Sequence, residues 1–323
     1  MFDFFRLLYG TVVLRPYVFA FLLAYLVAST AHLGRRKTLV FLPLGYFIAW
    51  LSEFSSIHWG VPYGDYYYIP TTVNEELWVL GVPFMDSLSY VFLSYCSYSM
   101  AIFLLSPVVF TTRSVFILEA RKERRSWQTL TLGAFLFVLL DIIIDPVALQ
   151  GYRWFLGQIY GYREVGTYFG IPMSNFGGWL LVGLAMIGAL QVLDLFPELE
   201  PRSVSVFQRI WGIGLLGPVL YLSVMAFNLT ITFHIGERLM GAVGCLIVLF
   251  SFLPAIFFTL YKQANLTPKL LDRHLRDFPL SIAASGEGSL LLRSFLLKAE
   301  IRGEGGTERE LAQIPSGHTQ QSG

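Results

Sequence analysis

Seven apolar stretches, each near the length needed to cross a lipid bilayer, run through the first 262 residues of this chain. A helix needs about 20 mostly apolar residues to cross the hydrocarbon core. The pattern therefore predicts an all-α fold, a polytopic transmembrane helix bundle of about seven spans. We expect these spans at residues 13–32, 38–54, 85–110, 127–144, 173–195, 210–233 and 239–260.

The composition disfavours several other classes of protein. Of the 323 residues, 55% are hydrophobic and 14% are charged, whereas an average soluble domain is about one quarter charged. The net charge of +1 leaves no basic excess to hold a polyanion, so we expect no nucleic-acid partner. We expect a multi-pass protein of a bacterial or archaeal cytoplasmic membrane, surrounded by membrane lipids.

Basic residues collect at one end of the predicted bundle. The first, third and fifth connections carry ten Lys and Arg residues, and the other three carry only Arg153, Arg163 and Arg238. Because Lys and Arg are enriched in cytoplasmic loops, we expect the N-terminus outside and the C-terminus inside. Residues 1–262 then form the transmembrane domain. Residues 263–323 form a cytoplasmic tail, amphipathic at 290–300 and disordered at its polar end.

Five polar residues fall at membrane depth, all at the predicted outer ends of their helices: Glu53, Asp86, Asp141, Asp145 and Asn175. A carboxyl group in the bilayer costs about 2.5–3.5 kcal/mol on insertion scales, so such residues are functional candidates by default. The structural alternative is that they sit at the interface, where polar and aromatic residues are ordinary. We take the four carboxyl residues as candidate catalytic groups.

Asp141 and Asp145 are the hardest of these to explain structurally. Their i, i+4 spacing puts both on one helical face, where like charges repel. Either one of them carries a proton, or a cation or an Arg lies between them. Pro146 predicts that the helix ends near Asp145. Asp86 differs, because it is expected in the first turn of its helix, where the dipole favours a carboxylate.

The two long outer loops add His58, Asp65 and many aromatic residues, among them Tyr67 and Tyr168. His58 with Glu53 and the two aspartates could hold a divalent cation, but their spacing matches no known metal motif. We predict neither a metal nor a cofactor. Residues 212–217 fit the pattern G-x-G-x-x-G, but they fall within a predicted span with no strand before them. We interpret these glycines as sites of close helix packing.

Several blocks occur in an order that resembles one family. They are SEFSS at 52–56, GVPYGDYYY at 60–68, GVPFMDSLSY at 81–90, DIIIDPVAL at 141–149 and YFGIPMSNFGGW at 168–179. Together they resemble the membrane carotenoid-biosynthesis family that contains hydratases of acyclic carotenoid end groups. The resemblance covers residues 15–179 well and the last two spans by hydropathy alone.

The resemblance implies hydration of the terminal C=C of an acyclic carotenoid or similar isoprenoid, a lyase reaction without a redox cofactor. A neutral carboxylic acid delivers the proton; Asp141 or Asp145 is our candidate, with Glu53 behind them, and Asp86 orients the water. Aromatic faces stabilise the cation, and the long substrate comes sideways from the lipid. The residues expected to bind substrate are His58, Asp65, Tyr67, Tyr168, Asn175 and Trp179.

Two other functions use the same acids. A proton-coupled lipid or isoprenoid carrier would use them as a relay, although carriers commonly have broken helices at the midplane and inverted repeats. A metal-dependent membrane hydrolase would need a bound metal. Only the hydratase predicts a product heavier by one water, formed with neither metal nor gradient.

Overall fold

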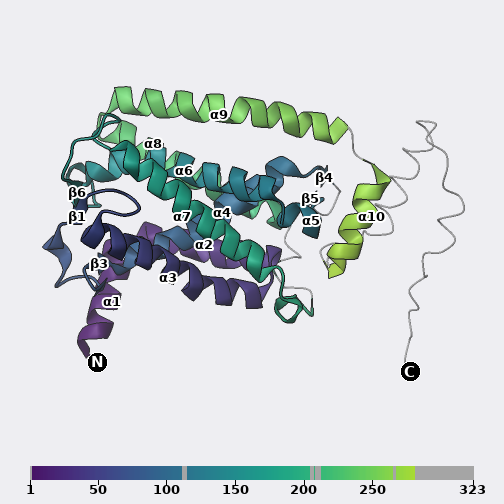
Figure 1. The fold of residues 1–323 in the computed structure, drawn as a ribbon, viewed down its shortest axis with the longest axis horizontal. Coiled ribbons are helices and arrows are strands. Elements are labelled where there is room, and N and C mark those ends of the chain that lie inside the picture. Colours follow the sequence, from purple (N-terminus) through teal and green to yellow (C-terminus); the bar gives the residue numbers. More distant parts are fainter. Residues whose placement is uncertain (1, 111–114, 204–206, 208–211, 265–266, 281–323) are drawn as a thin grey trace, which may run out of the picture.

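Seven long helices lie side by side and form the body of the protein (Figure 1). The computed structural model describes residues 2–110, 115–203, 207, 212–264 and 267–280. Within these ranges six helices are long and apolar enough to cross a membrane, or seven spans if a helix pair bent by 90° counts as one. The protein is thus the predicted α-helical membrane bundle. The seven helices are α2 (Pro16–His32), α3 (Arg35–Trp59), α4 (Phe84–Leu105), α6 (Trp127–Leu149), α7 (Met173–Leu193), α8 (Leu216–His234) and α9 (Arg238–Ala264).

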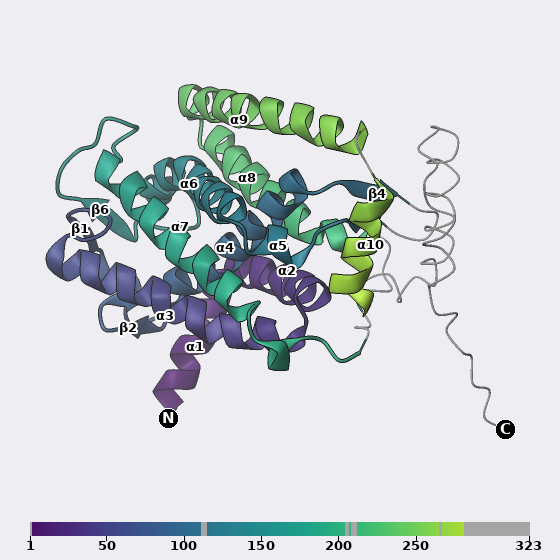
Figure 2. The same cartoon turned by 45° about the vertical axis from the view of Figure 1, so that its right-hand side comes forward.

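Helix α4 forms the centre of the bundle, because it is buried along most of its length. Its neighbours α3, α6, α7, α8 and α2 all contact it, and α6 packs most extensively on α7. Helix α9 lies on the outside beyond α8, and only 6% of its spanning segment is buried (Figure 2). In a membrane this exposed apolar surface faces lipid.

The first predicted span is wrong at its start, because the chain breaks at Arg15. Helix α1 (Phe2–Leu14) and α2 meet at 90°. Pro16 has no N–H to continue a helix, and it restricts the residue before it to non-helical backbone. The Arg15 side chain is buried and donates to both carboxylate oxygens of Glu76, at 3.0 and 2.9 Å. The bend therefore has both a backbone and a side-chain cause.

The fourth predicted span ends too early. Helix α6 continues through Pro146 to Leu149. Pro146 has no N–H to bond the carbonyl of Ile142, a loss that membrane helices tolerate. Near the end of α6 the Tyr160 hydroxyl donates to the carbonyl of Asp145 at 3.3 Å, and the Trp154 indole donates to that of Val147 at 2.9 Å. Asp141 and Asp145 consequently lie on continuous helix, one turn apart.

Two further boundaries differ from the prediction. The third span ends at Leu105 rather than near residue 110, because Pro107 follows and residues 108–110 pair as a strand. The sixth span begins at Ile213 with one turn of 3-10 helix, and α8 follows from Leu216, so the glycine motif at 212–217 lies at the start of the span. A Cβ on Gly217 would come within 2.1 Å of Ser99 Oγ. This glycine therefore allows the close packing that the sequence suggested.

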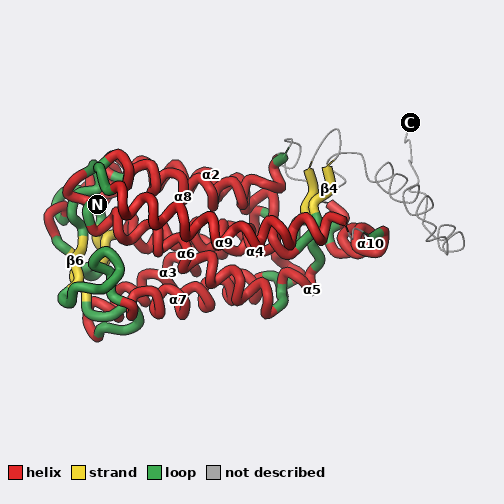
Figure 3. Tube along the Cα trace, turned by 90° about the horizontal axis from the view of Figure 1, so that it is seen from above, coloured by secondary structure: helices red, strands yellow, loops and turns green. Residues whose placement is uncertain are grey.

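Short strands lie at both ends of the bundle (Figure 3). At one end, hereafter the site end, β1 (Tyr66–Tyr68) pairs antiparallel with β6 (Tyr160–Tyr162), and β2 (Trp78–Val79) pairs with β3 (Val82–Pro83). At the other end, the basic end, β4 (Val108–Phe110) pairs with β5 (Val115–Ile117). The short helices α5 (Arg121–Arg124) and α10 (Pro268–Asp277) lie beside them. The predicted amphipathic segment at 290–300 and the polar end after it fall outside the described residues.

Ion pairs gather the three basic connections at the basic end. Lys37 Nζ donates to Asp194 at 2.6 Å and to Glu200 at 2.8 Å, and Arg125 Nε donates to Asp194 at 2.9 Å. Burial alone would raise the pKa of the Asp194 carboxyl, but Arg124 and Lys37 lower it. Which side of the membrane this end faces stays a prediction.

We expect Asp194→Asn to destabilise the protein by about 3–5 kcal/mol, because it leaves buried cations without their counter-charge. Thermal unfolding of the detergent-purified protein measures the change. The control is Asp272→Asn, which removes an exposed i, i+4 pair with Arg276 and should change stability by less than about 1 kcal/mol. Equal melting temperatures for the two variants would contradict this account of the basic end.

Candidate active site

A small polar cavity of about 50 Å³ lies at the site end, enclosed by carboxyl, tyrosine, amide and indole side chains. Its lining comes from α3, β1, α4, α6, β6, α7 and the loop before β1. The residues are Glu53, Tyr63, Tyr66, Tyr68, Asp86, Tyr90, Asp145, Tyr160, Tyr162, Asn175 and Trp179. Segments far apart in the sequence therefore converge on one space.

The pairing of β1 with β6 turns four tyrosines toward this space. Successive side chains of a strand point to opposite faces, so Tyr66 and Tyr68 share one face and Tyr67 takes the other. The register sets Tyr66 opposite Tyr162 and Tyr68 opposite Tyr160. All four of these tyrosines line the cavity, whereas Tyr67 is 45% exposed.

Tyr68 bridges the first pair of carboxyl groups, Glu53 and Asp86. Its hydroxyl lies 2.8 Å from Glu53 Oε2 and also contacts Asp86 Oδ2. One hydroxyl has a single proton to donate. When Tyr68 donates to one carboxylate, the other carboxyl must itself hold a proton to make the second hydrogen bond. The hydroxyls of Tyr66 and Tyr90 also donate to Glu53.

Asn175 bridges the second pair, Asp141 and Asp145. Its Nδ2 donates to Asp141 Oδ2 at 2.9 Å and to Asp145 Oδ2 at 2.8 Å, which uses both amide protons. Asp145 also accepts from Tyr160 at 2.9 Å and from Tyr162 at 2.7 Å. Asp141 is fully buried, and its Oδ1 has no hydrogen-bond partner among the described residues. A neutral amide thus lies between the two aspartates, and no Arg among the described residues contacts them.

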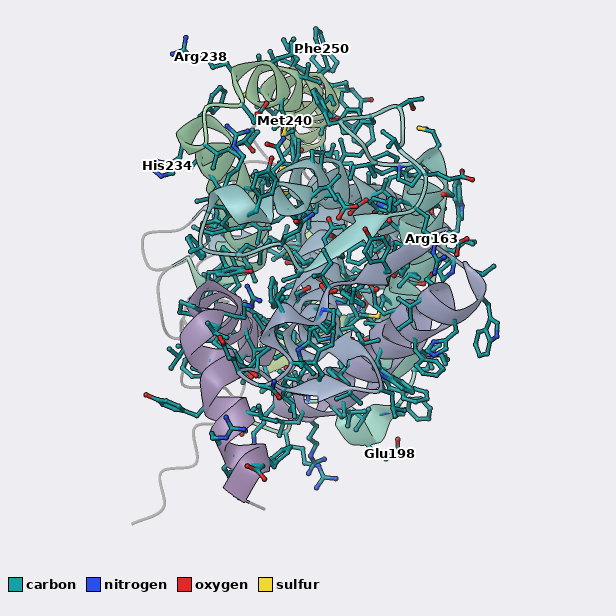
Figure 4. The ribbon with its side chains drawn as sticks, turned by 90° about the vertical axis from the view of Figure 1, so that its left-hand side faces the viewer. Arg163, Glu198, His234, Arg238, Met240 and Phe250 are labelled. Atoms are coloured by element: carbon teal, nitrogen blue, oxygen red, sulfur yellow. The ribbon has the colours of Figure 1, made fainter. Side chains whose placement is uncertain are left out.

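The cavity holds acids without bases. Among the described residues, no Lys, Arg or His lines it, and no group of three or more His, Cys, Asp or Glu is arranged to hold a metal ion. The labelled Arg163, His234 and Arg238 at this end point outward (Figure 4). Burial and the Asp145 carboxylate raise the pKa of Tyr160 and Tyr162, so these tyrosines remain O–H donors. Protons shared within each carboxyl pair are the available way to reduce the charge.

An apolar cavity of about 100 Å³ adjoins the polar one. Its walls come mainly from aliphatic and aromatic residues of α2, α4, α6 and α8, with Trp154, Leu156 and Ile159 from the loop before β6. Both cavities share the residues Asp86, Tyr90, Asp145, Tyr160 and Trp179. One acid from each bridged pair therefore meets an apolar space, which suits an apolar ligand with its reacting end at the acids.

The structure brings together six of the ten residues that the sequence proposed for the site. Asp141 joins the others through Asn175, and the remaining five line the polar cavity: Glu53, Asp86, Asp145, Asn175 and Trp179.

The other four lie elsewhere. His58 is exposed, and its Nδ1 lies 2.8 Å from the carbonyl of Phe54. Asp65 is exposed beside Gly60. Tyr67 points away, and Tyr168 packs on Phe169 and Phe176. None of the four lines either cavity, and their predicted binding role has no support from the geometry.

Tyr90 is the site residue that sequence reasoning missed as a functional candidate. It lies on α4 one turn after Asp86, and its ring stacks on Trp179 with centroids 4.6 Å apart. The spacing i, i+4 places Asp86 and Tyr90 on one face of the helix, so the candidate Asp86 could have indicated Tyr90. The four tyrosines of β1 and β6 were noticed only as loop aromatics, because nothing local in sequence predicts that two three-residue strands pair.

A larger cavity of about 210 Å³ lies at the basic end, near the α2 terminus, β5 and α10. Its charged residues are already engaged with one another: Arg124 donates twice to Glu119 at 2.7 Å, and Arg121 bonds Glu200 at 2.9 Å. The smaller cavity, with acids that share hydrogen bonds and face apolar space, is the better candidate for chemistry.

Two adjacent glycines of α7 offer a test of how the site is held. A Cβ on Gly178 would meet Tyr63 at 2.6 Å and the Pro62 carbonyl at 2.7 Å, whereas one on Gly177 meets nothing within 4 Å. We expect Gly178→Ala to cost about 1–3 kcal/mol through overpacking and to displace Tyr63. Gly177→Ala should leave stability unchanged or raise it slightly. Melting curves of both variants decide, and equal values would refute the close approach of α7 to this loop.

Fold and site together define a class: a polytopic membrane protein with a small site lined by acids beside an apolar cavity. The family model described as "Carotenoid biosynthesis protein" matches residues 9–251. The chain belongs to that family, which gives it a role in carotenoid biosynthesis and carotenoid or other isoprenoid substrates. Comparison with curated proteins and with solved structures gives no significant match.

Proposed function

We propose that the protein hydrates the terminal C=C of an acyclic carotenoid. The observation that carries the proposal is the position of Asp86 and Asp145, one from each carboxyl pair, where the polar cavity meets the apolar one. Adding water to an isolated double bond needs an acid at one carbon and a water held at the other. An apolar end group seated in the apolar cavity presents its double bond to both carboxyl groups.

The Asp141/Asp145 pair is the acid in this proposal. Asn175 holds the two side chains together, and Asp145 faces the cavities while Asp141 lies behind it. Asp145 gives its proton to the CH carbon of the double bond. The π electrons form the new C–H bond, and the dimethyl-substituted carbon becomes a tertiary cation. Asp141, buried and with one oxygen unpartnered, holds the proton that recharges Asp145.

The Glu53/Asp86 pair is the base. Asp86 lies in the first turn of α4, where the helix dipole favours the carboxylate form. It accepts a proton from the water that attacks the cation, so the water oxygen bonds to the tertiary carbon and gives an alcohol. Through Tyr68 the gained proton is shared with Glu53. Its return to the aspartate pair closes the cycle, with one water consumed.

Aromatic rings surround the position of the cation. Trp179 and Tyr90 stack and line both cavities, and Phe137 packs on Trp179 with centroids 4.7 Å apart. Ring faces attract cations by about 2 kcal/mol or more where water is excluded. No redox step occurs in this scheme, because addition of water leaves the overall oxidation state of the substrate unchanged.

The first test is mass spectrometry of carotenoids from a lycopene-producing bacterial host with and without this chain. We expect new species heavier by one or two waters, with the added oxygen labelled in H₂¹⁸O. Asp145→Asn removes the proton donor and should reduce product at least 100-fold. Glu164→Gln, an exposed change near β6, is the control and should match the wild type. An unchanged pigment profile with well-inserted protein would overturn the proposal.

A second test separates the acid from the base. In D₂O, Asp86→Asn keeps the acid pair, so the cation forms and loses a proton again without capturing water. We expect this variant to exchange deuterium into the recovered substrate while alcohol formation falls at least 100-fold. Asp145→Asn should do neither. Deuterium exchange in Asp145→Asn but not in Asp86→Asn would reverse the two assignments.

A further inference from the structure

One wall of the apolar cavity consists of aromatic rings that the proposed chemistry does not use. Tyr17 and Phe21 come from α2, Phe227 from α8 and Trp154 from the loop before β6. Tyr17 and Phe227 stack across the seam between α2 and α8, with centroids 5.4 Å apart and planes at 19°. Phe21 and Trp154 pack around this pair with centroids 5.7 and 6.3 Å from Phe227 and Tyr17, respectively.

The loop at 150–157 forms part of the cavity wall at the site end. Arg153 bonds the Glu237 side chain and the Ile235 carbonyl in the turn between α8 and α9. Arg15, at the start of α2, donates to the Leu156 carbonyl. The loop is therefore tied to both helices whose seam holds the stacked rings, and its Trp154 and Leu156 form part of the cavity lining.

The other walls belong to the protein core. Phe92 and Leu93 of α4 are buried, as is Val224 of α8. Tyr17, Phe21 and Phe227 are only partly buried, and the neighbouring Phe155 is 57% exposed. A cavity of about 100 Å³ holds an end group and not a C40 chain. The rest of such a chain must leave through the wall, and the ring-lined seam is a partly exposed part of that wall.

We propose that the stacked pair of Tyr17 and Phe227 is a side door, through which the conjugated chain of the substrate passes from the cavity into lipid between α2 and α8. The inference rests on the proposed function and extends it to the rest of the substrate. Flat rings stack on a planar conjugated chain, so the door selects for a linear polyene. The two rings separate to either side of the chain when the end group reaches the acids.

The test compares substrates that need the door with one that does not. The probes are lycopene, a C40 polyene, and a C10 acyclic isoprenoid with the same dimethyl-substituted terminal double bond. For Phe227→Ala we expect KM for lycopene to rise about tenfold, the loss of one ring stack and its buried area, with kcat within twofold. KM for the C10 probe should change less than twofold. Phe250→Ala, on the outward face of α9 (Figure 4), is the matched control.

A crosslink gives a second measurement that does not depend on removing a ring. The variant carries Tyr17→Cys and Phe227→Cys together with Cys96→Ser and Cys245→Ser, and a short reducible crosslinker joins the two new thiols. We expect lycopene turnover to stop and to return on reduction. The uncrosslinked variant controls for folding. Full turnover in the crosslinked variant would contradict the proposal that the substrate chain passes between positions 17 and 227. An equal rise in KM for both probes after Phe227→Ala would contradict it too.

A binding measurement distinguishes failure of the proposed side door from failure of the proposed hydration. Quenching of tryptophan fluorescence by lycopene measures affinity without turnover. A wild type that binds lycopene but forms no alcohol from either probe refutes the hydration, while weaker binding to Phe227→Ala than to Phe250→Ala still supports the door. If those two variants bind lycopene with equal affinity, the proposed passage between Tyr17 and Phe227 is refuted, whether or not the protein hydrates either probe.

Discussion

Four carboxyl groups lie close together in the interior at the site end, and among the described residues no basic side chain lines the cavity beside them. Charges in such a space repel strongly because there is little solvent to screen them. The structure meets this constraint with neutral bridges: Tyr68 between Glu53 and Asp86, and Asn175 between Asp141 and Asp145. Much of the surrounding structure positions these two bridges, including the β1–β6 pair, the first turns of α4 and α7, and the continuous helix around Pro146.

The sequence predicted the features that depend on local composition. Apolar runs set the number and order of the helices, and polar residues within them marked Glu53, Asp86, Asp145 and Asn175, which line one cavity. A charged residue in an apolar run has a clear signal because it is costly there. The i, i+4 spacing of Asp141 and Asp145 likewise predicted a shared face, and the structure places both on Asn175.

Features that depend on distant contacts were not predictable in the same way. Which tyrosines of a YYY run face inward depends on pairing with Tyr160–Tyr162, more than 90 residues later. Tyr67 was therefore predicted to bind substrate, although its neighbours Tyr66 and Tyr68 are the residues that line the cavity. The buried ion pair at the Arg15 bend involves Glu76 in a remote loop, and the end of α6 is bonded by Tyr160 and Trp154, which come after it in the sequence. His58 and Asp65 carried a plausible chemistry, but their side chains lie on the exposed side of their segments.

The pairing of β1 with β6 also has a consequence for biogenesis. Helices of a membrane protein emerge from the ribosome in order, and β1 is made long before β6. Until β6 arrives, Tyr66 and Tyr68 lack their strand partner, and until α7 follows, Asn175 is absent from the two aspartates. The two aspartates of α6 are thus made before Asn175, the residue that bridges them. Completion of the site is therefore tied to insertion of α7, and a nascent chain that stops earlier carries Asp141 and Asp145 without the amide that holds them together.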